Sequence, residues 1–171
     1  VERVFSAQMA DPTFPVPLSA MKSKLTFEDF NVGNELRPAA DILIKTAPLR
    51  HPNEATAFRV EYGGHSVCYV TDTEHDPDKP DQIILDFIKD ADLVIYDSTY
   101  TDEEFPQKVG WGHSTWQEGI RLCRAAKAKQ LALFHHDPDH DDATMTVIEQ
   151  KARATWSGAF AARDEMVLQI E

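Results

Sequence analysis

A twelve-residue stretch of the chain, Leu131 to Asp142, concentrates side chains that bind metal ions. It begins as a short apolar segment of strand length and continues with eight residues that hold three histidines and four aspartates. Imidazole nitrogen and carboxylate oxygen are common ligands of zinc, manganese and non-haem iron. A helix-capping turn, with Asp141 or Asp142 as the N-cap, explains one or two aspartates but not three histidines. The stretch therefore favours a metal site at the end of a buried strand.

Other candidate ligands follow apolar strands or open a helix in the same way, which gives the set His51, Asp72, Asp97, His113 and His135. Strand ends of an α/β sheet gather along one edge, so we expect these side chains to converge in the folded chain. Single ligands that are scattered along the sequence and joined by folding are typical of hydrolytic metal sites. Structural zinc sites instead use local CxxC pairs.

Hydrophobic periodicity predicts the elements that position these residues. The clearest is a hairpin of residues 56–62 and 65–71, joined by Gly63-Gly64, which supplies the positive φ angles of a tight turn. Further strands are expected over residues 41–48, 91–96, 131–134 and 166–170, and helices over residues 83–88, 114–130 and 144–156. In the second of these helices, Ser114 and Gln117 form a candidate capping box. A strand-rich first half and an alternating second half indicate an α/β chain with a mixed sheet.

Length and composition fit one domain of 171 residues, with residues 1–24 as an irregular, proline-containing lead-in. The net charge is −12, from 17 Lys and Arg against 29 Asp and Glu, which makes nucleic acid an unfavourable partner. No apolar run approaches the ~20 residues of a membrane span, and no signal segment opens the sequence. Because no apolar run is long enough, we expect no membrane contact. Cys68 and Cys123 have no evident partner, so we expect a reducing, cytoplasmic setting.

Five motifs, in this order, resemble the C-terminal half of metallo-β-lactamase-fold hydrolases: His51-Pro-Asn, Tyr69-Val-Thr-Asp72-Thr-Glu, Leu93-Val-Ile-Tyr-Asp97-Ser-Thr, Gly112-His113-Ser-Thr and Leu133-Phe-His135. The branch they resemble holds the tRNA 3′-processing endonucleases and related phosphodiesterases. Order and spacing agree from about residue 40 to residue 140. The resemblance implies one metallo-β-lactamase-like domain over residues 1–171, the C-terminal half of an αββα sandwich with a mixed sheet.

The resemblance also implies roles for the candidate residues. His51, Asp72 and His135 take the positions of metal ligands, with Asp72 bridging two divalent cations, zinc first and manganese or iron as alternatives. His113 takes the position of a histidine that acts near the scissile phosphate, and Asp97 that of an acidic residue that orients it. The residue types fit this chemistry independently, because two cations stabilise charge on a phosphorane and a protonated histidine donates to a leaving oxygen.

One part of the family pattern is missing, the first metal motif His-x-His-x-Asp-His. The nearest match is His135-x-Asp137-x-Asp139-His140, which has an aspartate in place of the second histidine and only 31 residues after it. We therefore expect the N-terminal half of the fold to be absent from this chain. A missing half, or a second copy of the chain, is then an expected partner.

These observations lead to three hypotheses of function. The first is a metal-dependent phosphodiesterase acting on a small substrate such as a cyclic nucleotide, since the net charge disfavours tRNA. The second is a non-catalytic or incomplete module that acts in binding or regulation, and the third is a thioester or lactone hydrolase on the same scaffold. For the other polar residues, Glu74 and His75 are expected to be solvated loop residues, and His136 and His140 have even chances of contacting the site.

Overall fold

The computed structural model describes residues 1–170, and the chain divides into two compact units, Val1–Asn31 and Val32–Glu171. The first unit departs from the irregular lead-in that the sequence predicts over residues 1–24. It contains the helix α1 (Glu2–Gln8) and the 3-10 turn η1 (Leu18–Ala20). The amino group of Val1 lies 2.7 Å from a carboxylate oxygen of Asp29, so an ion pair joins the two ends of this unit.

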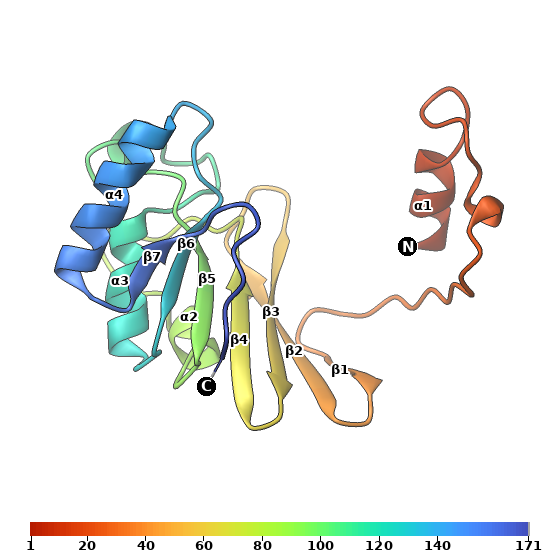
Figure 1. Cartoon of the computed structure of the whole chain (residues 1–171), viewed down its shortest axis with the longest axis horizontal. Helices are drawn as coiled ribbons and strands as arrows, with labels where there is room; N and C mark the ends of the chain where they lie inside the picture. Colours follow the sequence, from red (N-terminus) through yellow and green to blue (C-terminus); the bar gives the residue numbers. More distant parts are fainter. Residues whose placement is uncertain (171) are drawn as a thin grey trace. The chain divides into compact units, whose positions relative to one another are not determined.

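The second unit is built on one seven-stranded sheet whose strand order follows the chain (Figure 1). Strands β1 to β4 pair antiparallel and strands β4 to β7 pair parallel, so the mixed sheet predicted from the sequence is confirmed. The strands are β1 (Glu35–Ala39), β2 (Ile42–Leu49), β3 (Ala55–Tyr62), β4 (His65–Val70), β5 (Leu93–Asp97), β6 (Leu131–Phe134) and β7 (Ala159–Ala161).

Three helices connect the parallel strands, and all three cover the same face of the sheet (Figure 1). They are α2 (Gln82–Phe87), α3 (Trp116–Ala125) and α4 (Asp142–Thr155), and a 3-10 turn, η2 (Phe105–Gln107), lies in the loop before α3. Successive right-handed crossovers in one direction along a sheet place their helices on one side. The main core lies between these helices and the sheet, with Val70, Val94 and Leu133 fully buried.

The predicted hairpin is confirmed, but two other predicted features differ from the structure. Helix α3 is capped by Thr115, whose hydroxyl accepts from the backbone of Glu118, because Ser114 is already bonded to other side chains. The last strand is Ala159–Ala161 and not residues 166–170. With three residues, this strand is too short to give a periodic signal. Ile170, in the apolar stretch that suggests a strand, packs against Leu93, Ala132 and Phe160 on the face of the sheet.

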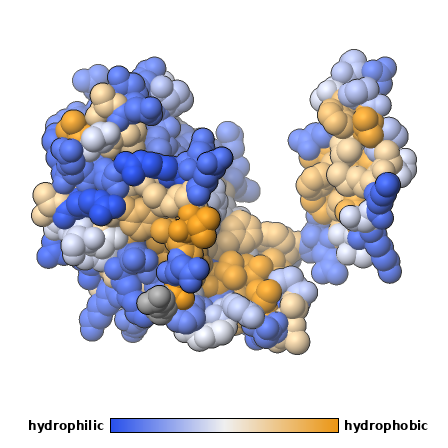
Figure 2. All heavy atoms as spheres, viewed as in Figure 1, coloured by the Kyte–Doolittle hydropathy of each residue, from blue (hydrophilic) through white to orange (hydrophobic). Residues whose placement is uncertain are grey.

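The face of the sheet opposite the helices, here called the open face, is apolar and partly exposed. The register places Val60 opposite Val67 and Tyr69 opposite Ile95, so these side chains share a face, and Val60 and Tyr69 are 38% and 39% exposed. Figure 2 shows apolar side chains gathered over the strands. Among residues 1–170, no helix has both the length and the apolar character that crossing a membrane requires.

Candidate metal centre

Four strands that run in the same direction end at one edge of the sheet, and each delivers a candidate residue there. His51 follows β2, Asp72 follows β4, Asp97 closes β5 and His135 follows β6. Asp72 and His135 have positive φ angles of 61° and 59°. Such angles are uncommon for residues other than glycine and are enriched at functional sites. They turn the chain sharply at the point where it leaves the sheet.

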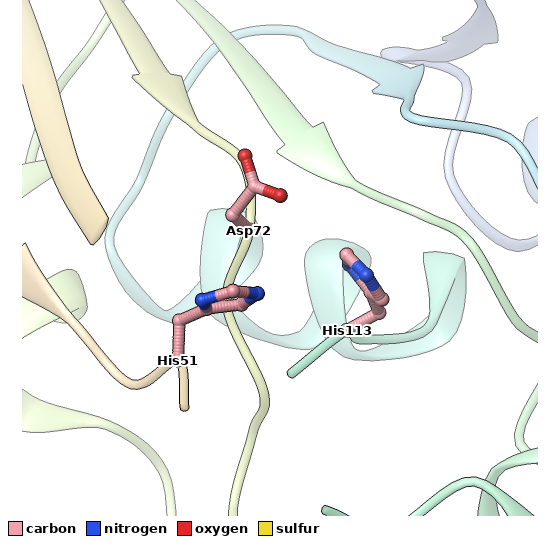
Figure 3. A group of neighbouring side chains, drawn as sticks. All are labelled: His51, Asp72 and His113. Atoms are coloured by element: carbon pink, nitrogen blue, oxygen red, sulfur yellow. The ribbon is translucent and has the colours of Figure 1, made fainter. Parts of the chain in front are cut away.

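The structure brings together all five side chains predicted from the sequence. His51, Asp72 and His113 each offer one ligand atom within 4.8 Å of the others (Figure 3), and so do Asp97, His113 and His135. His135 Nε2 lies 3.5 Å from a carboxylate oxygen of Asp72, which links the two groups. The ring of His113 is stacked on that of His135, with 4.7 Å between centroids. This separation of nitrogen and oxygen donors suits divalent cations.

Asp97 is the most heavily hydrogen-bonded residue of the site, and its side chain has no exposed surface. Its Oδ2 accepts from the backbone N–H groups of Asp72 and Thr73, at 3.0 and 3.2 Å. Its Oδ1 accepts from the N–H and hydroxyl of Thr99 and from the N–H of Ser114. A buried carboxylate needs such partners to remain charged. Asp97 thereby joins three of the loops that form the site.

Asp97 also fixes the orientation of His113. The two side chains are 3.0 Å apart, between Oδ2 and Nδ1, and because a carboxylate only accepts, His113 Nδ1 carries the hydrogen. The bond to Asp97 raises the pKa of His113 above its ordinary value, and its partial burial acts in the opposite direction. The charges of Asp97, Asp72 and Glu74 add to the increase. His113 therefore favours the protonated form more than a solvated histidine does.

In His51 and His135, the Nδ1 atom lies within hydrogen-bond distance of a neighbouring residue outside the ligand set. Thr99 Oγ1 lies 3.1 Å from His135 Nδ1, and His135 Nε2 points toward Asp72. His51 Nδ1 accepts from the N–H of Asn53 at 3.2 Å, which places the hydrogen of a neutral His51 ring on Nε2, so a cation bound at Nε2 would have to displace that hydrogen. Histidine ligands more commonly donate the hydrogen of the second nitrogen to a neighbouring acceptor. The donor set present therefore fits a divalent cation.

Two residues that the sequence predicts to be solvated are buried beside the site. Glu74 is 6% exposed, and one carboxylate oxygen accepts from the N–H groups of Gly110 and Gly112. His75, also 6% exposed, contacts Ser114 Oγ through Nδ1 at 2.8 Å and stacks on Phe105. Burial lowers the pKa of His75. The only signal for either residue in the sequence is its position two or three residues after Asp72.

The remaining histidines of the His/Asp stretch are at the margin of the site. His140 Nε2 is 2.9 Å from a carboxylate oxygen of Glu104, so this pair ties the loop after β6 to the loop after β5. His136 Nε2 is 3.3 Å from the carbonyl oxygen of Ala162. Asp141 is the N-cap of α4, as one of the sequence interpretations has it. Within the described residues, none of these three joins a group with ligand geometry.

A protein-family model described as "Beta-lactamase superfamily domain" matches residues 6–136. The chain belongs to this superfamily. Two curated relatives are both named ribonuclease Z. The one from Thermoplasma volcanium is 34% identical over 109 residues, which is 63% of this chain and 33% of the relative. The one from Haloferax volcanii is 33% identical over 108 residues, 63% of this chain and 32% of the relative. The chain thus matches about a third of the length of these relatives.

Solved structures confirm the predicted fold class. The metallo-β-lactamase-fold protein YhfI from Bacillus subtilis superposes with a TM-score of 0.64 at 23% identity, over 78% of this chain and 52% of that one. The short form of human tRNase Z superposes with a TM-score of 0.61 at 22% identity, over 80% of this chain and 45% of that one. The resemblance to the tRNA-processing branch is supported by the curated relatives within the matched superfamily, and the two solved structures show the fold.

Proposed function

We propose that the complete protein is a metal-dependent hydrolase that cleaves a phosphodiester bond. The observation that carries the proposal is the hydrogen-bonded pair of buried Asp97 and partly buried His113, which lies among the candidate cation ligands. This arrangement supplies a proton donor at the place where a leaving oxygen needs one. The identity of the relatives as ribonucleases Z supports phosphodiester rather than acyl substrates.

In the proposed site, His51, Asp72 and His135 would hold divalent metal, with two zinc ions as the first choice and manganese or iron as alternatives. When bound, these cations supply Lewis-acid stabilisation of the negative charge that forms on the phosphoryl group. The carboxylate of Asp72 could serve as a ligand, since the backbone N–H of Asp72 and not its carboxylate bonds to Asp97. Ligands on several rigid strand ends hold the reacting groups at fixed distances.

His113 is the proposed general acid. Asp97 accepts the Nδ1 hydrogen and keeps Nε2 directed away from the sheet edge, so a proton on Nε2 can pass to the leaving oxygen. A water molecule attacks phosphorus and forms a new P–O bond as the bond to the leaving oxygen breaks. The water releases a proton to solvent, and the neutral His113 then regains a proton from solvent. The bond to Asp97 raises the pKa of His113, which favours the protonated form that this step uses.

The relatives favour RNA as the substrate of the complete protein, against the expectation from charge alone that nucleic acid is an unfavourable partner. Both curated relatives described above are ribonucleases by name. An exposed aromatic residue beside the site suits a nucleotide. Trp111 is 61% exposed, directly before Gly112 and His113, and the ammonium group of Lys108 lies 4.6 Å from its ring centroid. A base can stack on such a ring, and the cation attracts phosphate.

A small phosphodiester such as a cyclic nucleotide is the second candidate substrate. The net charge of −12 favours it, because a long polyanion is repelled by an acidic surface. The two substrates require the same chemistry at His113 and differ only in the surface that they touch. Cys68 and Cys123, both buried and unpaired, suit the cytoplasmic setting that either substrate implies.

The test is hydrolysis by the complete protein with added zinc or manganese. A precursor tRNA with a 3′ extension, a 3′,5′-cyclic nucleotide and a thioester are compared at equal concentration. Cleavage of the precursor supports the leading proposal, and cleavage of the cyclic nucleotide alone supports the second substrate. Hydrolysis of the thioester alone contradicts phosphodiester chemistry. Bound metal without turnover of any of these substrates supports the hypothesis of a non-catalytic module.

His113→Ala separates the proposed acid from a metal ligand. We expect kcat to fall about 10²- to 10⁴-fold, the usual contribution of a general acid. The metal content, measured by elemental analysis, stays at the wild-type value, because His51, Asp72 and His135 remain. The matched control is His65→Ala, which removes a 42%-exposed histidine at the opposite end of β4. Loss of metal in His113→Ala would assign His113 as a ligand instead.

A further inference from the structure

The loop of residues 108–114, which carries His113, is held against the metal-ligand loops by a carboxylate that neither the family match nor the sequence motifs assign. One oxygen of Glu74 accepts from Gly110 N at 2.7 Å and from Gly112 N at 2.9 Å. These short distances are typical of hydrogen bonds to a charged acceptor. Glu74 thus bonds to the backbone on both sides of Trp111, immediately before His113.

The backbone of Glu74 makes a second connection, to the loop that carries His51. Its N–H donates to the carbonyl oxygen of Arg50 at 2.8 Å. Glu74 also lies two residues after Asp72 on the same loop. Glu74 therefore connects the three segments that carry His51, Asp72 and His113.

The space between these segments is tight, so small displacements of the loop move His113 relative to His51. A Cβ built on Gly112 would lie 2.4 Å from Cδ2 and 2.8 Å from Nε2 of His51. The rings of His51 and His113 have their centroids 5.8 Å apart. With the Glu74 bonds absent, the buried N–H of Gly112 would lose its acceptor, and the part-buried N–H of Gly110 would lose its bond to the same oxygen.

We propose that Glu74 is a positioning residue, which holds the His113 loop in register with the metal-ligand loops through the hydrogen bonds to Gly110 and Gly112. This inference rests on the proposed function for its kinetic consequence. The carboxylate is not placed to bind a cation, since it belongs to neither of the ligand groups found among the described residues. It acts through the position of His113, where a shift of about 1 Å costs on the order of 10²-fold in rate.

The test compares Glu74→Met with Glu74→Gln in the complete protein. Both side chains match glutamate in length and fill the same buried space, but only glutamine keeps an oxygen acceptor for the two glycines. We expect Glu74→Met to lower kcat for bis(p-nitrophenyl) phosphate about 10²-fold with KM and bound zinc unchanged. Glu74→Gln is expected to recover about tenfold of that loss, because a neutral acceptor bonds less strongly than a charged one. The control is Glu103→Met, at an exposed position of the neighbouring loop.

A second readout does not depend on activity. In the metal-free, ¹⁵N-labelled protein, the amide protons of Gly110 and Gly112 should move upfield in Glu74→Met and stay near their wild-type positions in Glu74→Gln. Unchanged glycine amides in Glu74→Met, or equal kcat losses in the Met and Gln variants, would overturn the inference. A wild-type protein without phosphodiesterase activity would contradict the proposed function alone. The amide shifts would still show whether Glu74 accepts hydrogen bonds from Gly110 and Gly112.

Discussion

At the scale of single residues, the site depends on backbone positions that only certain residues can occupy. Gly112 has a φ angle of +90° and lies directly against His51, so it satisfies two constraints at once. Gly110, two residues earlier, has a φ angle of +91° with open space around it. The two glycines share the conformation and differ in their surroundings. They therefore separate the cost of backbone strain from the cost of crowding His51.

We predict that Gly112→Ala weakens zinc binding by the complete protein at least tenfold and Gly110→Ala does not. Both variants place a side chain at positive φ, at a cost of roughly 1 kcal/mol each. Only the methyl group at residue 112 meets the imidazole of His51 and the ring of Pro52, so His51 must move from its position in the site. Zinc titration with a competing chelator measures the difference. Equal zinc affinities in the two variants would show that the contact with His51 does not matter.

The candidate site can be predicted from sequence as far as strand ends reveal it. His51, Asp72, Asp97 and His135 each follow a predicted strand, and the common direction of β2, β4, β5 and β6 makes them converge. Glu74 and His75 cannot be predicted in this way. Their burial comes from residues 105–114, which are more than 30 positions away in sequence and have no periodic signal.

At the scale of elements, some helices and strands can likewise be predicted from the sequence and others cannot. The hairpin of β3 and β4 and the apolar strands β5 and β6 are evident because alternation and runs of branched residues follow directly from burial. Strand β7 has three residues, too few for a pattern. The C-terminal apolar stretch resembles a strand in its sequence. In the structure, Ile170 packs on the open face without forming a strand.

The end of the sheet away from the metal centre is stabilised by Asp92, at the start of β5. Its carboxylate accepts from Ser66 N at 2.7 Å and from the ammonium group of Lys129 at 2.6 Å, and it is 7% exposed. The bond from Lys129 is the largest cause that lowers the pKa of Asp92, the Ser66 N–H adds to it, and burial opposes both. Asp92 therefore ties β4 and the loop before β6 to the start of β5.

We predict that Asp92→Asn lowers the free energy of unfolding by about 1–3 kcal/mol at pH 7. Because the folded-state pKa of Asp92 is below its unfolded value, the stabilisation is present above the unfolded pKa of about 4 and is lost as the pH falls through the folded pKa. The difference between wild type and variant should therefore shrink below about pH 4. Urea unfolding at several pH values measures it. The control is Asp78→Asn at an exposed position, and a difference that is independent of pH would contradict the role of the charge.

At the scale of the whole second unit, the sheet is covered by helices on one face only. The open face carries Val60, Tyr69 and Phe134, each more than a third exposed, on three different strands. Tyr69 and Phe134 meet edge to face, with ring centroids 5.9 Å apart. Contiguous apolar surface of this kind marks an interaction site, whereas single exposed apolar residues are ordinary. The open face is thus the part of this unit where association is expected.

We predict that this chain binds the dye ANS through the open face and that Val60→Lys combined with Tyr69→Lys lowers the fluorescence at least twofold. Lysine at these positions breaks the patch while its stem still lies over the neighbouring strands. The control is Ile83→Lys, which removes a residue of α2 that is 52% exposed and lies outside the open face. Because an isolated apolar side chain does not form a dye site, the control should bind as wild type does. An equal decrease in the control would mean that the dye reports general surface apolarity. A complete protein that binds no dye, while this chain does, would show that the remainder of the polypeptide covers the open face.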